Sequence, residues 1–392
     1  MLKKSGFIFF VIITLFISGC ADKRAILWNS DNATQSSIEA SKAAINQPAK
    51  PIAVVPIYVA TSRQRQDNLS MPFSAKRSPI LSFAKVDVGI PGAHKKGFVE
   101  SNGYKPDPAK HFAATSVQNY KNKQAFKAAL NSALAKLPDG KREILLFIHG
   151  YNNNFADSTF RAAQFAYDFK LNAVIVHYSW PSGGSIPLYV YDRDSADFGR
   201  DGLADLLTLL SETNAKQINV LAHSMGNYVT MEALRTLSLK GRQNVINRIS
   251  GYLMAAPDID VDVFERQLKD IKKMPQPTAV IVSRKDKALK ISGTLTGGHA
   301  RVGDGSSIDL LNKNGIIVAD ASNLDGGSHG VFASSPTLMT LARDGSLSKN
   351  ILNGDGEEPA NAILADGTAV VTSTASLILY APLRILQSVG NR

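Results

Sequence analysis

A serine lies where a short apolar segment gives way to a helical one, a position that favours nucleophilic chemistry. The apolar segment INVLA ends at Ala222, and Ser224 follows, with Gly226 two residues further on. A serine at a sharp strand-to-helix turn projects its hydroxyl above the strand end, and small residues two before and two after it avoid clashes. Alanine is small enough to serve at the first of these positions. We therefore predict that Ser224 is an acyl-transfer nucleophile and that the adjacent His223 supports the turn.

An acid and a base are expected further along the chain, because at a turn of this kind the order is serine, acid, histidine. Asp286 follows an apolar segment that we predict to be a strand, and Asp258 follows the preceding one, so Asp258 is the less favoured alternative. After Asp286 come only two histidines, His299 and His329. His329 follows the last predicted central strand and is the preferred base.

A second loop has the composition expected of an oxyanion hole. His149 and Gly150 directly follow the apolar segment ILLFI. A glycine lets the backbone approach a substrate oxygen, and the neighbouring N–H groups can donate to it. We predict donation from the backbones of Tyr151 and Met225. His149, Gly150 and Gly226 are expected to support the loop and the turn rather than to react.

These residues predict a covalent acyl-enzyme mechanism. His329 would take the proton of Ser224 as the hydroxyl attacks an acyl carbonyl, Asp286 would orient His329, and water would then release the acyl group. An esterase or lipase acting on acyl esters is the favoured function. A serine amidase or peptidase on the same triad and a non-catalytic, lipid-anchored scaffold protein are the alternatives. No cofactor and no metal site are expected, because the HExxH motif and the phosphate-loop motif are absent from the sequence.

The elements that must position these residues alternate regularly from residue 143 onward. Short apolar runs separated by helical segments of 10 to 16 residues predict a mostly parallel sheet covered on both faces, an α/β fold. A first strand and antiparallel edge strands are expected before this region. The predicted strands are 52–60, 80–88, 144–148, 173–177, 218–222, 249–255, 279–283 and 316–319, and the predicted helices are 122–137, 157–169, 196–211, 225–237 and 262–272.

Two further segments each allow two interpretations. The aromatic stretch 178–192, which follows a predicted strand, would either line an acyl pocket or pack as a structural loop. The apolar run 375–386 near the C-terminus predicts a helix that packs on the body of the protein, with a membrane-surface role less favoured.

The chain begins with two lysines and a short apolar run that ends at the only cysteine, Cys20. This pattern is typical of a secretory signal, and the sequence ISGC resembles the bacterial lipobox, at which the signal is cut and the cysteine carries lipid. Cys20 is therefore the expected lipid attachment site. Because Ala21 rather than aspartate follows it, the protein is expected in the cell envelope, at the outer membrane if the organism is Gram-negative.

The 392 residues carry 44 basic and 33 acidic side chains, a net charge of +11. Loss of Lys3 and Lys4 with the signal leaves 42 basic residues and a net charge of +9. The basic residues are scattered and form no basic helix or aromatic RNA-binding motif, so nucleic acid is not an expected partner. A small acyl ester or lipid-like substrate, the membrane and an anionic envelope polymer remain as candidate partners.

Several stretches together resemble a bacterial family of largely uncharacterised α/β-hydrolases, often found as envelope proteins. The stretches are VPIYVATSR (55–63), ILLFIHGYNNNF (144–155), VHYSWPSGG (176–184), INVLAHSMGN (218–227), MAAPDIDVDVF (254–264), VSRKDKAL (282–289) and SHG (328–330). The resemblance covers about 52–335. It implies an α/β-hydrolase fold with Ser224, Asp286 and His329 as triad and favours Asp286 over Asp258, but it supplies no substrate.

The expected organisation has three parts. Residues 1–19 form a lipoprotein signal peptide, residues 20–50 a lipid-anchored tether, and residues 51–392 one α/β-hydrolase domain with a C-terminal extension. A domain of about 340 residues is within the range of an elaborated single α/β domain.

Overall fold

The computed structural model describes residues 24–28 and 50–339. Within them one sheet of nine strands has the order β3-β2-β1-β5-β4-β6-β7-β8-β9. The pairs from β1–β5 to β8–β9 are parallel, whereas β2 is antiparallel to both β1 and β3. The strands are β1 (Ala53–Arg65), β2 (Phe73–Ile90), β3 (Ala113–Tyr120), β4 (Glu143–Ile148), β5 (Val174–Ser179), β6 (Gln217–His223), β7 (Gly251–Ala255), β8 (Thr278–Val282) and β9 (Ile317–Asp320).

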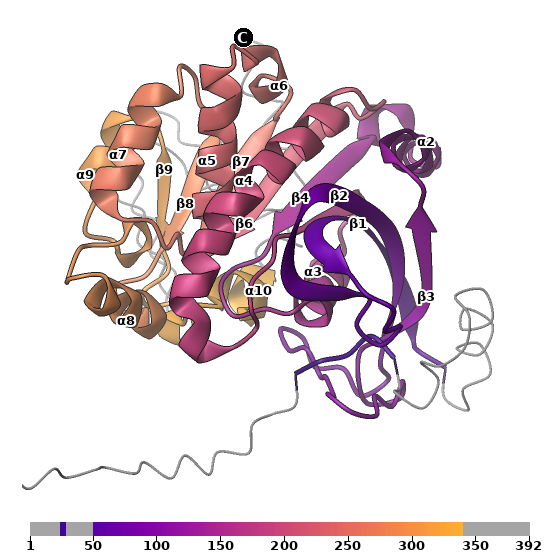
Figure 1. Ribbon diagram of the computed structural model, residues 1–392. Helices are drawn as coiled ribbons and strands as arrows, with labels where there is room; N and C mark the ends of the chain where they lie inside the picture. Colours follow the sequence, from indigo (N-terminus) through magenta and orange to yellow (C-terminus); the bar gives the residue numbers. More distant parts are fainter. Residues whose placement is uncertain (1–23, 29–49, 340–392) are drawn as a thin grey trace, which may run out of the picture.

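Helices cover both faces of the sheet (Figure 1). They are α2 (Lys123–Leu134), α3 (Phe155–Asp168), α4 (Tyr189–Ser211), α5 (Met225–Leu239), α6 (Gln243–Ile246), α7 (Val261–Asp270), α8 (Lys287–Leu295), α9 (Ile308–Lys313) and α10 (Val331–Ser334). One core layer lies between the sheet and α3 and α10. The other lies between the sheet and the remaining large helices, chiefly α2, α4, α5 and α7.

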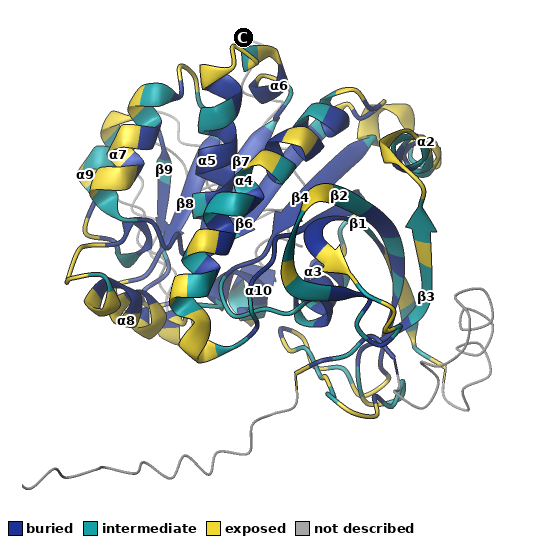
Figure 2. Cartoon of the chain, in the orientation of Figure 1, coloured by how far each residue is buried: buried dark blue, intermediate teal, exposed yellow. Residues whose placement is uncertain are grey.

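The central strands are buried on both sides, as their composition predicts. All six residues of β4 are buried, with Leu145 and Phe147 in one core layer and Ile144, Leu146 and Ile148 in the other. Alternate strand residues point to opposite faces, so a strand covered on both sides must be apolar at every position. Figure 2 shows this: the central strands are dark blue, whereas the helices turn exposed faces to solvent.

The predicted α/β architecture is confirmed, and each strand and helix predicted within the described region has a counterpart there. The antiparallel strands do lie at one edge of the sheet. Two elements begin seven residues earlier than predicted: β2 begins at Phe73 rather than at residue 80, and α4 begins at Tyr189 rather than at residue 196. The first turns of α4, YVYDRDS, lack a clear apolar period, and buried contacts of Asp192 hold them instead. The expectations for residues 1–19, Cys20 and 375–386 lie outside the described residues.

Residues 24–28 pack into the domain. Leu27 and Ala25 are buried, the Leu27 N–H donates to the Ser70 carbonyl at 2.8 Å, and the Trp28 Nε1–H donates to the Ala114 carbonyl at 2.6 Å. Part of the stretch predicted as a lipid-anchored tether, 20–50, is therefore packed against the domain. Residues 21–50 are mostly polar, but they include a short apolar segment, AILW, whose buried side chains pack in the core.

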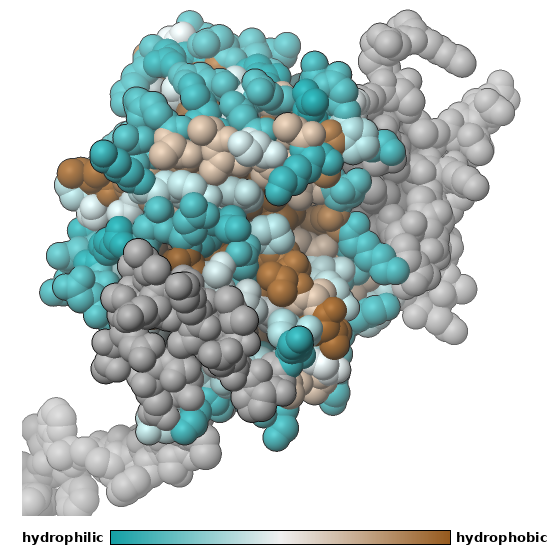
Figure 3. Space-filling view, turned by 90° about the vertical axis from the view of Figure 1, so that its right-hand side faces the viewer, coloured by the Kyte–Doolittle hydropathy of each residue, from teal (hydrophilic) through white to brown (hydrophobic). Residues whose placement is uncertain are grey.

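The surface on the side of β3 and α2 is mostly hydrophilic, with apolar atoms in separate patches (Figure 3). Within 24–28 and 50–339, no helix has both the length and the apolar character needed to cross a bilayer.

A buried ionic cluster holds the loop between β2 and β3 against α3. His94 lies between two carboxylates, with Nδ1 2.9 Å from Glu100 Oε2 and Nε2 2.9 Å from Asp168 Oδ1, and its side chain is 3% exposed. Burial disfavours the charged imidazole, but the hydrogen bonds to Asp168 and Glu100 outweigh it, so the pKa of His94 is raised above 6.5. Burial also opposes ionisation of Asp168, but hydrogen bonds from His94, Gly97 and Gln164 hold the pKa of this carboxyl below 3.8.

The cluster predicts a pH-dependent contribution to stability. Because the folded pKa of His94 exceeds its unfolded value, its contribution is complete below pH 6.5 and is lost as pH rises through the folded pKa. The contribution of Asp168 is present above pH 3.8 and is lost as pH falls through its lowered folded pKa. We expect His94→Gln to lower the free energy of unfolding by about 2 kcal/mol at mildly acidic pH, and by less in alkaline buffer, as measured by denaturant unfolding.

Lys127→Gln is the matched control, because Lys127 pairs with the exposed Glu212 at 3.0 Å. Its effect should be below about 1 kcal/mol and flat across the same pH range. A His94→Gln effect that grew with rising pH would contradict the assignment of a charged His94.

Candidate catalytic site

Ser224 occupies a strained turn between β6 and α5. Its φ of 53° and ψ of −126° lie outside the regions that a side chain favours. Neighbouring strand ends hold this conformation: its N–H donates to the Ala255 carbonyl at 2.9 Å, and its carbonyl accepts from the N–H groups of Asn227 and Asp258 at 3.0 and 3.3 Å. Strain of this kind persists where surrounding structure determines it and is often found at functional sites.

Two glycines allow three backbone segments to converge at Ser224. A Cβ on Gly226 would lie 2.4 Å from the His149 carbonyl oxygen and 2.8 Å from that of Ile148. A Cβ on Gly150 would lie 2.8 Å from Ser224 Cβ. The end of β4 is therefore packed directly against the serine turn, and neither position has room for a side chain.

Asp286 and His329 are joined by a short hydrogen bond, with 2.6 Å between Asp286 Oδ2 and His329 Nδ1. Asp286 follows β8 and caps the N-terminus of α8, because its Oδ1 accepts from the Leu289 N–H at 3.0 Å. The carboxylate is buried and so has a fixed orientation. His329 lies in the loop between β9 and α10, and its Nε2 has no hydrogen-bond partner among the described residues.

His223 connects the serine turn to His329. Its Nε2 is 3.0 Å from the His329 carbonyl oxygen, and the two rings have centroids 4.7 Å apart. Burial, followed by the nearby His329, holds the pKa of His223 well below 6.5, so the ring is neutral and can donate this hydrogen bond. The described structure contains no direct hydrogen bond between Ser224 Oγ and His329. Such contacts are often long before substrate binds.

The alternative acid, Asp258, and the alternative base, His299, contact other residues. Asp258 Oδ1 accepts from Ser292 Oγ at 2.6 Å and lies 3.5 Å from Arg301 Nε, so its buried charge is compensated away from His329. The exposed His299 lies 3.6 Å from Asp260. Of the four candidates, the structure brings together Asp286 and His329.

The loop after β4 is held by buried polar contacts. His149 Nδ1 lies 2.8 Å from the Gly150 carbonyl and Nε2 lies 3.1 Å from the Trp180 carbonyl, and the ring stacks on Trp180 at 4.9 Å. Burial, then the charge of Arg63, lowers the pKa of His149 well below 6.5. A neutral, fully packed ring fits the structural role expected of His149.

Arg63 was not predicted as a site residue. It is buried at the end of β1 and donates to the carbonyls of Asn153 and Ser182 at 2.8 and 2.9 Å and to Ser179 Oγ at 2.9 Å. Burial lowers its pKa to about 10, so it stays charged at neutral pH. It thereby ties the loop after β4 to the loop after β5. The signal was present in the sequence as an arginine close behind the apolar run VPIYVA of a predicted strand.

Asp192 fixes the same two loops from the start of α4. Its carboxylate accepts from Ser182 Oγ at 2.5 Å and from the N–H groups of Gly183 and Asn152 at 2.6 and 3.1 Å. The backbone N–H groups of Tyr151 and Met225 have no acceptor among the described residues. They belong to segments that Gly150 and Gly226 bring together at Ser224, which is the arrangement an oxyanion hole needs.

The aromatic stretch 178–192 divides into two parts. Tyr178 and Trp180 are completely buried and pack in the core, as the structural interpretation predicts. Tyr189 lies nearer the serine turn: its hydroxyl is 2.8 Å from Ser292 Oγ and 3.4 Å from Asp258 Oδ2, and its ring meets Tyr151 edge-on at 5.4 Å.

Comparison with known proteins identifies the family. The model of a family described as "Alpha/beta hydrolase of unknown function (DUF900)" matches residues 122–344, more than half of the chain. The chain belongs to this family. No curated protein matches it.

Solved structures of other hydrolases match this chain with low sequence identity and low TM-scores. A fungal esterase structure from Rhizomucor miehei has 12% identity and a TM-score of 0.34, over 81% of this chain and 90% of that one. An esterase from Pyrobaculum calidifontis has 12% identity and a TM-score of 0.32, over 75% of this chain and 83% of that one. Aspergillus fumigatus lipase B has 14% identity and a TM-score of 0.23, over 36% of this chain, and the match spans 30% of the lipase. Such low scores say nothing of substrate.

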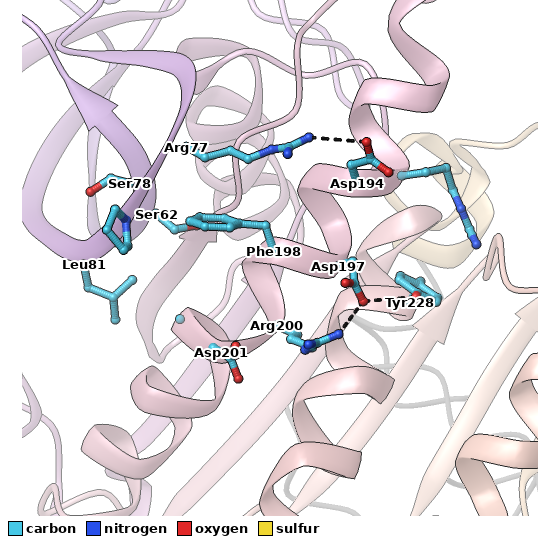
Figure 4. A pocket seen from close by; sticks show the side chains of 13 residues that line it. Ser62, Arg77, Ser78, Leu81, Asp194, Asp197, Phe198, Arg200, Asp201 and Tyr228 are labelled. Atoms are coloured by element: carbon cyan, nitrogen blue, oxygen red, sulfur yellow. Dashed lines mark hydrogen bonds and ion pairs between the residues drawn. The ribbon is translucent and has the colours of Figure 1, made fainter.

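A cavity of about 700 Å³ lies beside α4 in this α/β-hydrolase (Figure 4). Arg77 reaches toward Asp194, and Asp197 contacts both Arg200 and Tyr228. Ser224 and His329 are not among its lining residues. Its three arginines and three aspartates make it unlike the apolar pocket that an acyl chain requires.

One group of side chains in the described region could offer ligands to a metal ion. Carboxylate oxygens of Asp260 and Asp262 and a ring nitrogen of His299 lie within 4.8 Å of one another. Asp260 already caps α7 through the N–H groups of Asp262 and Val263, and His299 is largely exposed. The group is distinct from Asp286 and His329 and contributes nothing to their chemistry.

The close approach at Gly226 predicts a position-specific loss of stability in this α/β-hydrolase. We expect Gly226→Ala to lower the free energy of unfolding by about 1–3 kcal/mol, because the new methyl group meets two backbone carbonyls that cannot rotate away. Gly140→Ala is the control, since a Cβ there has nothing within 4 Å. Its effect should be within about 0.5 kcal/mol. Equal unfolding midpoints for the two variants would contradict the packing at the serine turn.

Proposed function

We propose that this α/β-hydrolase is a serine hydrolase that acts on acyl esters, with Ser224 as nucleophile, His329 as base and Asp286 as the orienting acid. The observation that carries the proposal is the 2.6 Å bond between Asp286 and His329, next to a strained serine whose neighbour His223 holds the His329 backbone. A serine at a strained strand-to-helix turn, a buried carboxylate and an imidazole, in this chain order, match the requirements of acyl transfer.

The first half of the reaction forms an acyl-enzyme. His329 Nε2 takes the proton of Ser224 Oγ as Oγ bonds to the ester carbonyl carbon. The carbonyl oxygen becomes an oxyanion, which the N–H groups of Tyr151 and Met225 stabilise, together with the positive N-terminal end of α5. The tetrahedral centre then collapses, the ester C–O bond breaks, and His329 gives its proton to the departing alcohol.

The second half repeats the chemistry with water. His329 takes a proton from water, whose oxygen attacks the acyl carbon, and the bond to Ser224 Oγ breaks as Oγ recovers the proton. Throughout, Asp286 holds the proton of His329 on Nδ1, so Nε2 is the nitrogen that exchanges protons with Ser224. The cap that Asp286 makes on α8 keeps this carboxylate from turning away.

Activity-based labelling tests the proposal. A fluorophosphonate probe should label the folded wild-type protein and miss Ser224→Ala. With p-nitrophenyl butyrate, Asp286→Asn should lower kcat by roughly 10³–10⁴-fold, because an uncharged amide favours the wrong imidazole tautomer. Asp258→Asn is the matched control, and its kcat should fall by less than about tenfold because Asp258 pairs with Arg301 rather than with His329.

The remaining outcomes decide between the alternatives. A folded wild-type protein without label would favour a non-catalytic scaffold. Faster turnover of matched amides than of esters would favour an amidase or peptidase on the same residues. A larger loss for Asp258→Asn than for Asp286→Asn, with both variants folded by circular dichroism, would transfer the acid role to Asp258.

A further inference from the structure

The chain enters the folded domain beside the catalytic site. Arg24 Nη1 donates to the Asn152 carbonyl at 3.1 Å and lies 3.4 Å from Asp157 Oδ2, and the Ala25 N–H donates to Asp157 Oδ1 at 3.2 Å. Asn152 directly follows Tyr151, whose N–H is assigned to the oxyanion hole. In Figure 1 this entry and α8 both lie in the lower half of the molecule, with α8 to the left of the entry.

This entry point restricts where an anchor can lie. Cys20 is four residues before Arg24. A chain of four residues spans at most about 14 Å even when fully extended. If Cys20 carries lipid, the surface of the membrane must therefore lie within about 14 Å of Arg24, and a long flexible tether between lipid and catalytic site is impossible.

The exposed face of α8 is suited to that membrane. The proposed acid, Asp286, is the N-cap of α8, and the exposed residues of this helix include Lys287, Lys290, Ile291 and Leu295, which recur at helical spacing. Ile291 and Leu295 are 62% and 64% exposed. Exposed apolar side chains flanked by lysines are the combination with which interfacial helices contact anionic lipid.

A second apolar segment flanks the site next to α8. Ile186 and Val190 are 72% and 73% exposed, on either side of the turn that begins α4. Tyr189 joins this turn to α8 through Ser292, and Tyr151 joins it to the oxyanion loop through the Ile186 carbonyl. Both apolar segments are thus connected by hydrogen bonds to residues around Ser224.

We propose that the lipid anchor holds this rim, formed by Ile186, Val190, Ile291 and Leu295, against the membrane that carries it, so that the substrate is a long-chain acyl ester resident in that membrane. The inference rests on the proposed function for its chemistry and on acylation of Cys20 for its geometry. The rim contacts the bilayer, and an ester carbonyl can reach Ser224 without its acyl chain crossing water.

Membrane contact is measured with a label at one position. Cys20 is the only cysteine in the chain, so in the lipidated protein Ile291→Cys presents the one free thiol for an environment-sensitive fluorophore. Leu239→Cys is the matched control: Leu239 is 66% exposed but ends α5, about 22 Å along the helix from Ser224. The full-length chain is reconstituted in vesicles of phosphatidylethanolamine and phosphatidylglycerol that contain spin-labelled lipid.

We expect the spin-labelled lipid to quench the fluorophore strongly at position 291 and little at position 239. The same result is expected when each variant also carries Ser224→Ala, because docking does not require catalysis. Equal quenching at the two positions, or none at 291, would overturn the proposal. A fluorophore at 291 that is already shielded in Cys20→Ser protein without vesicles would also overturn it. Shielding that depends on protein concentration would point to a second copy, and shielding that does not would point to another segment of this chain.

A substrate comparison separates this inference from the proposed function. The rates on p-nitrophenyl palmitate in the same vesicles and on soluble p-nitrophenyl butyrate are measured for the lipidated chain. The palmitate-to-butyrate ratio should fall about tenfold in Ile291→Ser/Leu295→Ser and stay constant in Leu239→Ser. An unchanged ratio would overturn the substrate assignment. A wild-type protein that cleaves neither ester would instead refute the proposed function, while the quenching result would still decide whether the rim docks.

Discussion

The close packing of the β4 end against the start of α5 is the constraint on which the site depends. Gly226 lies against the carbonyls of Ile148 and His149, and Gly150 lies against Ser224. These contacts bring a strained serine and two backbone N–H groups from different segments to one place. Since backbone atoms make the approach, no side-chain rearrangement can relax it, and the geometry exists before any substrate arrives.

Buried charge maintains this arrangement. Arg63 and Asp192 are far apart in the chain, yet both bind the loops after β4 and β5. Each would be costly to bury alone, and each is stabilised by several hydrogen bonds and by the charge of the other. Around the proposed triad, buried polar contacts thus hold the loops in position, whereas apolar packing holds the rest of the sheet.

The strands and the serine turn could be predicted because their signals are local. Apolar runs such as 144–148 and 218–222 must be strands buried on both faces, and Ala222, Ser224 and Gly226 have the sizes that the turn demands. Packing of Arg24 to Trp28 and the early start of α4 could not be predicted, because both depend on partners distant in sequence, such as Asp157 and Asn152.

The sequence by itself determined the α/β class, the strand order in the chain, the serine turn and a short set of candidate acids and bases. Only the tertiary structure paired Asp286 with His329 and Asp258 with Arg301. It also placed the first packed residues, Arg24 and Ala25, against Asn152 and Asp157 in the loop after β4 and the start of α3. The reason is physical: periodicity and residue size act between near neighbours, whereas the pairing of charges and the position of a chain end depend on how distant segments fold together.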